Sequence, residues 1–364
     1  MTTRTVVTYD ARHVGLPGVG RFVTGLWPAL QRAAGGSGVE LVALTPGRAR
    51  GWLGPSALTA PAGTRLRSAP LGLLEHAELP RAIKKAGAAV HHATHLGVPL
   101  RPPVPVVLTV HDVFPLLEPD HARSAAAAAY YRAVMPEAIR RASLVVAVSE
   151  LTACDLADRL GVTADAVIEH GIDHSLWHRR TEDEVASARR AFGLRAPYLL
   201  YVGTAKAHKN LGTVLGAHHV GLPTLVLAGP TAAEVARAAA RLPPGVRVLG
   251  RVEDGLLPAL YSGAVAVLAP SDYEAVGLTA LEAMACGTPV VASTGRGMAA
   301  TVGDAALMVA TRDRRAWAWA MTRVTEDDML RADLVRRGER VVAGRSWDEA
   351  AGRYVELYLK AAGR

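Results

Sequence analysis

The sequence predicts an α/β protein made of two successive domains, each with a parallel β-sheet covered by helices. Short apolar runs that indicate buried strands alternate with helical patterns along most of the chain, which is typical of parallel sheets. The 364 residues are enough for two domains of ordinary size, each with its own core. Half of the residues are hydrophobic and a fifth are charged, which indicates a globular chain rather than a disordered one.

The predicted elements follow one another in two series. In the first series the strands are RTVVTYD, VELVALT, AAVHHAT, VPVVLTVHD, LVVAVS and AVIEHGID, with helices near residues 20–34 and 122–142. The strands of the second series are YLLYVGT, PTLVLAGP, GVRVLGRV, GAVAVLAP and PVVAS, with helical segments between them. After Asp304 the chain is expected to be helical almost to its end, where RSWDEAAGRYVELYLKAAGR is predicted as an amphipathic helix.

A charged and weakly apolar segment, HSLWHRRTEDEVASARRAFGLRAP, separates the two series and suits a connection on the surface. We therefore predict an amino-terminal domain over residues 1–173 and a second domain over residues 174–345. Residues 174–196 of the second domain form the linker, and residues 346–364 form a separate last helix. Because ligands favour clefts between domains, two such domains predict a ligand site where they meet.

Composition narrows the classes of function. The formal net charge of +8 would suit nucleic acid, an anionic membrane surface or a phosphorylated ligand. Nucleic acid is disfavoured, because the chain has no long Lys/Arg run and only three Phe. No apolar run reaches the roughly 18 residues that span a bilayer, and the amino terminus has no signal-peptide pattern, so we expect a cytoplasmic protein. A peripheral membrane contact and the oligomeric state stay open. Cys154 and Cys286 lack metal-type spacing and are expected to be structural thiols.

Two carboxylates stand inside the otherwise apolar or small stretch SDYEAVGLTALEAMACGTPVVAS. Glu282 lies on the apolar face of a helix predicted after Gly277, where a carboxylate is costly unless something satisfies it. Glu274 lies in the loop after a strand that ends at Pro270. Such a strand, loop, helix and strand place a ligand crevice outside the carboxyl ends of the strands. At about 6 to 12 Å apart, the acids suit an extended polar ligand better than a metal ion. The alternative is a pair of solvated glutamates.

The segment YVGTAKAHKN contains a strand end, Gly203, a short basic loop and a helix start. These are the features that diphosphate binding needs, because a glycine lets the backbone approach and a cation neutralises the charge. Lys209 is the predicted cation. The alternative, a solvated lysine at a helix start, would be opposed by the helix dipole.

In YDARHVGLPGVGRFVTGL, Gly18 and Gly20 would allow the backbone to approach a phosphate or a sugar. A dinucleotide-binding fingerprint is the rival interpretation. It is disfavoured because seven residues separate the strand end at Asp10 from Gly18, and Val23 occupies the position of the third glycine.

Histidines follow two of the predicted strands. His111 and Asp112 in TVHDVFP are placed at the carboxyl end of a strand, where a histidine is either functional or simply a satisfied polar residue. The run HHATH from His91 to His95 could suggest a metal site, but it falls where a strand passes into a loop with Pro99 nearby, which disfavours helical ligation. We interpret this run as loop structure that lines the cleft.

Together these motifs resemble the GT-B retaining glycosyltransferases, in particular glycosyltransferase family four, over nearly the whole chain. The family pattern E-G-F-G-L-P-x-x-E-A-M-A-x-G-x-P-V-V matches EAVGLTALEAMACGTPVV, although Ala275 and Val276 replace the usual Gly-Phe. YVGTAKAHKN resembles the family's glycine-then-R-K-N stretch, with His208 where Arg is usual. The amino-terminal segment resembles its D-x-R and G-[IV]-G-R-[YF] loop. Further matches are VSE, HGID, LAGP, GRVEDGLLPALYSGA and VGDAALMV, without the Pro-Glu that usually precedes the last.

The resemblance implies two Rossmann-like domains that face each other across a cleft, with the last helix returning to the amino-terminal domain. It implies a cytoplasmic enzyme that moves a sugar from a nucleoside diphosphate donor to an acceptor hydroxyl or amine, with retained configuration. The implied catalytic residues are Lys209, Glu274 and His111. Glu274 would contact sugar hydroxyls, Glu282 the ribose, and the GRV turn the base. No cofactor or metal is expected, and the chain contains no D-x-D pair.

The same resemblance implies two sets of binding residues. The donor side comprises Gly18, Gly20, Gly203, Thr204, His208, Lys209, Arg251, Val252, Glu274, Ala275, Val276, Gly277, Leu278 and Glu282; the acceptor side comprises Asp10, Arg12, Arg21, His111 and Asp112. Two alternatives remain: a sugar-nucleotide epimerase or hydrolase on the same fold, and a nucleotide-sugar-binding partner subunit with weak or lost catalysis. The donor base, the sugar, the acceptor and the linkage are not named by the sequence.

Overall fold

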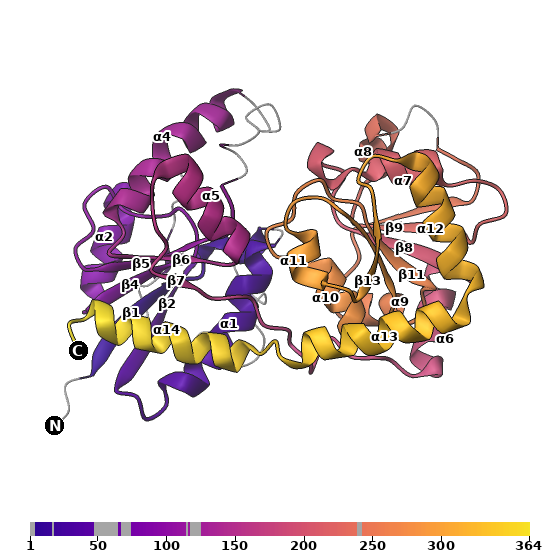
Figure 1. Cartoon of the computed structure of the whole chain (residues 1–364). Helices are drawn as coiled ribbons and strands as arrows, with labels where there is room; N and C mark the ends of the chain where they lie inside the picture. The colour runs from indigo at the N-terminus through magenta and orange to yellow at the C-terminus, as the bar shows by residue number, and fades with distance from the viewer. Residues whose placement is uncertain are drawn as a thin grey trace. The chain divides into compact units, whose positions relative to one another are not determined.

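The computed structural model describes residues 4–16, 18–46, 65–66, 74–113, 116, 125–238 and 242–364 (Figure 1). The chain divides into two compact units. Unit 1 comprises Met1–Gly171 and Ser346–Arg364, and unit 2 comprises Ile172–Arg345. The last segment of the chain therefore belongs to the same unit as the first.

Unit 1 is built on a parallel sheet with the order β3-β2-β1-β4-β5-β6-β7 among its described residues. Neighbouring strands all pair in parallel, and β4, β5 and β6 are buried along their whole length, which explains their continuous apolar runs. The strands are β1 (Thr5–Asp10), β2 (Val39–Pro46), β3 (Arg65–Leu66), β4 (Val90–Ala93), β5 (Val106–Val110), β6 (Leu144–Ala147) and β7 (Ala166–Val167).

The last helix is fastened to the sheet of unit 1 by two fully buried tyrosines. The hydroxyl of Tyr358 lies 2.6 Å from Nδ1 of His92 on β4, and that of Tyr354 lies 2.9 Å from Oγ1 of Thr109 on β5. This helix also packs against the first helix, where Gly25 leaves room for the Trp347 ring. Among the described residues of unit 1, the helices are η1 (Arg12–Gly15), α1 (Val19–Ala34), α2 (Glu75–Lys85), α4 (Ala125–Arg141), α5 (Glu150–Leu160) and α14 (Trp347–Ala361).

Unit 2 has a parallel sheet with the order β10-β9-β8-β11-β12-β13, counted over the residues that the structure describes. Its strands are β8 (Tyr198–Val202), β9 (Thr224–Ala228), β10 (Val246–Gly250), β11 (Ala266–Ala269), β12 (Val290–Ser293) and β13 (Ala306–Val309). The helices are α6 (Glu182–Phe192), η3 (Ala207–Lys209), α7 (Leu211–Ala217), α8 (Ala232–Ala238), α9 (Leu257–Ser262), α10 (Leu278–Ala285), α11 (Met298–Val302), α12 (Arg314–Glu326) and α13 (Asp328–Ala343).

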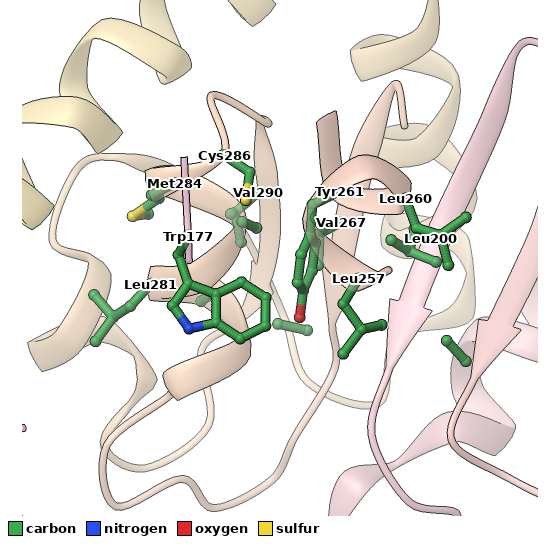
Figure 2. Close-up of a cluster of buried hydrophobic side chains, with 14 of the residues drawn as sticks. Trp177, Leu200, Leu257, Leu260, Tyr261, Val267, Leu281, Met284, Cys286 and Val290 are labelled. Carbon is green, nitrogen blue, oxygen red and sulfur yellow. The ribbon is translucent and has the colours of Figure 1, made fainter. Parts of the chain in front are cut away.

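Helices cover both faces of this second sheet, so unit 2 has two core layers (Figure 1). Figure 2 shows one of them, in which the rings of Trp177 and Tyr261 lie with centroids 5.9 Å apart. Leu281 of α10 and Leu200 of β8 belong to the same layer. The other layer is centred on Trp317 of α12, which is fully buried. The position of α10 is therefore fixed by close packing against the sheet.

Two of the sequence predictions need correction. The uninterrupted helical tail after Asp304 is wrong, because Ala306–Val309 forms β13, whose short apolar run pairs with β12. Residues 174–196 are not a simple connection: they contain α6, which begins with a capping box between Thr181 and Glu184. The predicted helix over 122–142 begins at residues outside the described part. No helix among the described residues has the length and apolar character needed to cross a membrane.

Candidate functional site

The strand order of unit 2 reverses between β8 and β11. Chain order runs outward through β9 and β10 on one side, and through β12 and β13 on the other. Ligands of doubly wound sheets bind outside the carboxyl ends of the strands at such a switch point. The loop after β8 carries Lys209, and the loop after β11 carries Glu274. The topology thus brings together two residues that are 65 positions apart in the sequence.

Lys209 and Glu274 form an ion pair at this point. Nζ of Lys209 lies 2.5 Å from Oε2 of Glu274, and the Ser271 hydroxyl donates to the same oxygen over 3.1 Å. Burial alone would raise the pKa of Glu274, but Lys209, Ser271 and His208 together hold it below the ordinary value. Glu274 is therefore an ionised carboxylate that only accepts hydrogen bonds. The pair offers one cation and one acceptor, and its side chains are 25% and 18% exposed.

The glycine predicted to approach a phosphate contacts another part of unit 2. A Cβ on Gly229 would lie only 2.0 Å from the carbonyl oxygen of Gly203, so the absence of a side chain at Gly229 lets the ends of β8 and β9 meet. Beyond Gly203, the Thr204 carbonyl accepts a hydrogen bond from the Tyr201 hydroxyl over 2.6 Å. A Cβ on Gly203 itself would lie 3.2 Å from the Tyr201 hydroxyl oxygen, and the contact of Gly203 with a donor stays a prediction.

The inward burial predicted for Glu282 is confirmed. Glu282 is 1% exposed, and its Oε2 accepts a hydrogen bond of 3.0 Å from the Tyr261 hydroxyl on α9. Gly277, the N-cap of α10, has a φ of 69° that favours glycine, and the Thr301 hydroxyl donates to the preceding Val276 carbonyl over 3.0 Å. The ribose contact of Glu282 stays a prediction.

The other donor-side residues of unit 2 differ in exposure. Ala275, Val276 and Leu278 are half-buried around the start of α10. In the GRV turn, Arg251 is exposed, whereas the Val252 side chain is 8% exposed and belongs to the hydrophobic core. A base at this turn would therefore meet Arg251 or the backbone rather than the body of Val252.

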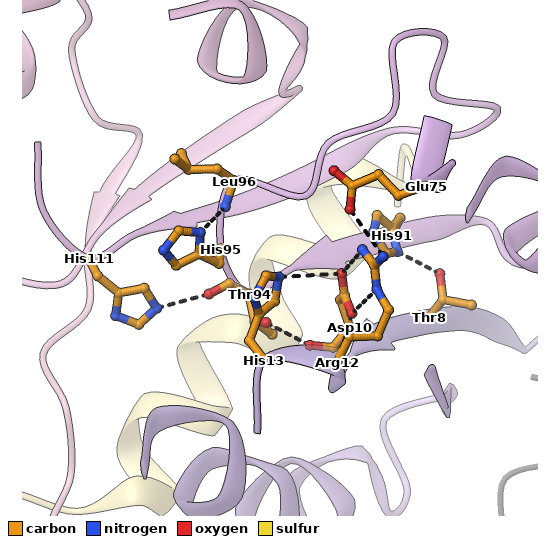
Figure 3. A network of polar contacts seen from close by, with 10 residues as sticks. All are labelled: Thr8, Asp10, Arg12, His13, Glu75, His91, Thr94, His95, Leu96 and His111. Atoms are coloured by element: carbon orange, nitrogen blue, oxygen red, sulfur yellow. Dashed lines mark hydrogen bonds and ion pairs between the residues drawn. The ribbon is translucent and has the colours of Figure 1, made fainter. Parts of the chain in front are cut away.

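Unit 1 contains a buried ionic network at the carboxyl end of β1 (Figure 3). Arg12 donates to both carboxylate oxygens of Asp10, from Nε over 2.8 Å and from Nη2 over 2.6 Å, and to Glu75 over 3.1 Å. These side chains are at most 1% exposed. Burial would raise the pKa of Asp10, but the charge and hydrogen bonds of Arg12 lower it well below the ordinary range. Asp10 and Arg12, two of the five residues predicted for the acceptor side, are thus held against each other, and their contact with an acceptor stays a prediction.

Glu75, a partner of Arg12 in this network, was not predicted from the sequence. It begins α2, 63 residues after Arg12, and is buried. The apolar helical pattern over residues 75–85, with Glu75 on its inward face, was the signal that could have located this partner.

The histidine run is placed differently from the prediction. His91 and His92 are fully buried residues of β4, so their interpretation as loop residues is wrong; His95 does lie in the following loop. His111 is half-buried, and its Nε2 donates to the Thr94 carbonyl over 2.8 Å (Figure 3). Burial lowers the pKa of His91 and His111 to about 4 and that of His92 to about 3, so all three are neutral at pH 7.

The two glycines at the start of α1, the N-cap Gly18 and the helical Gly20, have distinct structural roles. Gly18 has a φ of 81°, and Gly20 lies so close to η1 that a Cβ would be 2.3 Å from the Val14 carbonyl oxygen. Gly20 therefore approaches its own chain, and a phosphate contact of either glycine stays a prediction. Arg21 and Asp112 are half-buried and both have interaction partners.

We expect the stability of the protein to fall as the pH is lowered from 7.5 to 5. In the unfolded chain His91 and His92 would titrate near 6.5, but in the folded chain only near 4 and 3. Between these values the unfolded chain binds more protons, so acid favours unfolding. Urea unfolding at several pH values measures this slope. His91→Val should reduce the slope; a slope equal to that of the wild-type protein would contradict the expectation.

The chain is similar in sequence to curated glycosyltransferases. It is 31% identical to the D-inositol 3-phosphate glycosyltransferase of Salinispora arenicola over 252 residues, which cover 62% of this chain and 56% of that protein. It is 28% identical to the O-antigen chain mannosyltransferase B of Escherichia coli over 266 residues, which cover 69% of each. The match thus spans between about half and two thirds of these relatives' own length.

The fold is similar to solved structures over nearly the whole chain. Sucrose-phosphate synthase from Thermosynechococcus elongatus has a TM-score of 0.78 at 22% identity, covering 98% of this chain and 99% of the other. HepE from Anabaena, in complex with UDP-glucose, has a TM-score of 0.71 at 17% identity, covering 98% and 100%. At these identities the likeness concerns the fold, which is the two-sheet GT-B architecture.

Two family models cover most of the chain. The model described as Glycosyltransferase Family 4 matches residues 17–176, and the one described as Glycosyl transferases group 1 matches residues 196–327. The second match contains both Lys209 and Glu274. The chain therefore contains a Glycosyltransferase Family 4 domain followed by a Glycosyl transferases group 1 domain.

Proposed function

We propose that the protein is a retaining glycosyltransferase that moves a sugar from a nucleoside diphosphate sugar to an acceptor hydroxyl or amine. The observation that carries this proposal is the Lys209–Glu274 pair at the switch point of the unit 2 sheet. A lysine suits the diphosphate, and an ionised carboxylate suits the hydroxyl groups of a sugar. The family membership of the chain and the names of its relatives support the same class of reaction.

In the proposed reaction, negative charge develops on the diphosphate as the bond to the sugar breaks. The ammonium group of Lys209 stabilises this charge, and Glu274 holds the sugar in place by accepting hydrogen bonds from its hydroxyls. The acceptor attacks the anomeric carbon from the face that the diphosphate leaves and gives its proton to the departing diphosphate oxygen, so the anomeric configuration is retained. We propose that Lys209 supplies the positive charge without the help of a divalent metal or another cofactor.

Calorimetry with a panel of nucleoside diphosphates should identify the base, and transfer assays with the corresponding sugar donors should then identify the sugar and the acceptor. NMR of the product gives its anomeric configuration. We expect a glycoside with retained configuration, formed by the isolated chain and also in the presence of a chelator. Only free sugar or an epimerised donor would indicate a hydrolase or an epimerase, and turnover that requires a second protein would indicate a partner subunit.

We expect the two glutamates to differ in their effects on binding. Glu282→Gln should weaken the binding of a bare nucleoside diphosphate about ten-fold, because a charge-assisted hydrogen bond to the ribose is lost. Glu274→Gln should leave this affinity unchanged or higher, since Lys209 no longer shares its charge with a carboxylate, but should slow sugar transfer. Calorimetry and transfer assays measure both effects. An equal loss of nucleotide affinity in the two variants would contradict the distinction.

A further inference from the structure

Asn210 follows Lys209 directly and has an unusual backbone conformation. Its φ of 51° makes it the single non-glycine residue in the left-handed region within the described part of the chain. Asparagine tolerates this region better than other residues with a side chain, but glycine does so at lower cost. The backbone conformation therefore does not by itself explain why asparagine stands here.

The side-chain amide of Asn210 explains the residue type. Nδ2 donates to the carbonyl of Pro270 over 3.2 Å and to that of Thr311 over 2.7 Å, and Oδ1 accepts from the Thr213 hydroxyl over 2.7 Å. Pro270 follows the last residue of β11, and Thr311 lies just beyond β13. One amide thus joins three loops at the carboxyl edge of the sheet, which glycine cannot do.

A second connection lies on the other side of the lysine. The backbone carbonyl of His208 accepts a hydrogen bond of 2.7 Å from the backbone N–H of Asp272. Lys209 therefore lies between two attachments, one through His208 and one through Asn210. Both attachments lead to the loop after β11, which also carries Glu274.

We propose that Asn210 is a positioning residue, which sets the Lys209 ammonium against Glu274 and holds it where the leaving diphosphate would lie. The amide fixes the distance between the loops after β8 and β11, and the left-handed backbone directs the chain out of η3 into α7. This inference rests on the proposed function for its catalytic consequence, but the placement of Lys209 against Glu274 can be measured without turnover.

The variant Asn210→Gly keeps the left-handed backbone and removes only the amide. We expect kcat to fall about ten- to a hundred-fold with little change in KM, because a small displacement of a catalytic group is costly. The control Asp327→Ala removes the N-cap of α13, where Asp327 accepts from the N–H of Leu330 over 2.8 Å. Asp327→Ala should lose about as much stability as Asn210→Gly, but its kcat should stay unchanged. If Asn210→Gly does no more to kcat than this control, the amide is merely structural and the proposal is overturned.

A double-mutant cycle with Lys209→Ala tests whether Asn210 acts through the lysine. We expect Asn210→Gly to have little further effect on kcat once the Lys209 ammonium is absent. An equal fold-loss in both backgrounds would overturn the proposal. Thr213→Val, which removes the hydroxyl that orients the amide, should show a smaller loss of the same kind.

The third measurement uses no ligand. NMR titration of labelled glutamate carboxylates, with Glu274→Gln for assignment, gives the pKa of Glu274 in each variant. Because contact with Lys209 helps to lower this pKa, Asn210→Gly should raise it and Asp327→Ala should not. An unchanged Glu274 pKa in Asn210→Gly would overturn the positioning role even if the protein is a transferase. A raised pKa in a protein that transfers no sugar would support the positioning role and refute the proposed function instead.

Discussion

Replacing Lys209 with alanine is expected to lower the rate of sugar transfer by about a hundred- to a thousand-fold. This is the magnitude seen when one charge-stabilising group of a transition state is removed. Lys209 is placed for such a role, since its Nζ lies 2.5 Å from Glu274 at the switch point of the sheet and its side chain is 25% exposed. Because the side chain is not part of the core, the variant should fold normally.

The matched control is Lys206→Ala, in the same loop. Lys206 is exposed and three residues earlier, so its loss removes the same charge from the loop without removing the group paired with Glu274. We expect a several-fold effect at most in kcat/KM. Circular dichroism and thermal unfolding would show that both variants are folded. Similar losses for Lys206 and Lys209 would mean that only the overall charge of the loop matters.

The largest effect on stability is expected for Arg12→Ala, which should lower the free energy of unfolding by about 3 to 5 kcal/mol. The substitution leaves the carboxylates of Asp10 and Glu75 buried without their shared cation. Such uncompensated charges cost more than the packing that is lost. Since the network lies within unit 1, the loss should appear in the unfolding transition of that unit.

Urea unfolding at pH 7.5 measures this loss, with Arg32→Ala as control. Arg32 forms a pair with Asp348 at 2.7 Å, but both side chains are more than 60% exposed, so a far smaller change is expected. If Arg12→Ala does not fold, Glu75→Gln provides a milder test, because it neutralises one carboxylate and keeps its shape. Equal changes for Arg12→Ala and Arg32→Ala would contradict the structural argument.

The fold was largely predictable because parallel strands buried on both faces leave continuous apolar runs in the sequence. Two strands were missed: β3, which has only two residues, and β13, which has four residues and lies between helices, where its apolar residues also fit a helical pattern. The loops of Lys209 and Glu274 meet because β8 and β11 are neighbours in the sheet. The family resemblance implied this strand order, but hydrophobic periodicity alone does not predict it. Local sequence patterns thus indicated most helices and strands, but they did not indicate which strands and loops lie next to each other.

The candidate site was predictable to a lesser degree. Asp10 and Arg12 were singled out from the sequence, but residue type does not reveal whether an arginine faces a ligand or a buried partner such as Glu75. The inward position of Glu282 followed from helical spacing, whereas its Tyr261 partner depends on how α9 packs. For Asn210 the deciding facts are a backbone angle and two carbonyls from distant loops, which no local pattern encodes.

The helix α14 has a consequence for the order in which the chain folds during synthesis. Unit 2 is continuous in sequence, whereas unit 1 is interrupted by it and is completed only by residues 346–364. While the ribosome is still translating unit 2, His92 of β4 and Thr109 of β5 lack the hydroxyls of Tyr358 and Tyr354. Domains generally fold as units in the order of their synthesis. In this chain, however, synthesis of unit 1 begins first but is completed last. The surface of the unit 1 sheet that α14 covers is therefore exposed, and open to aggregation, until the whole of unit 2 has been synthesised.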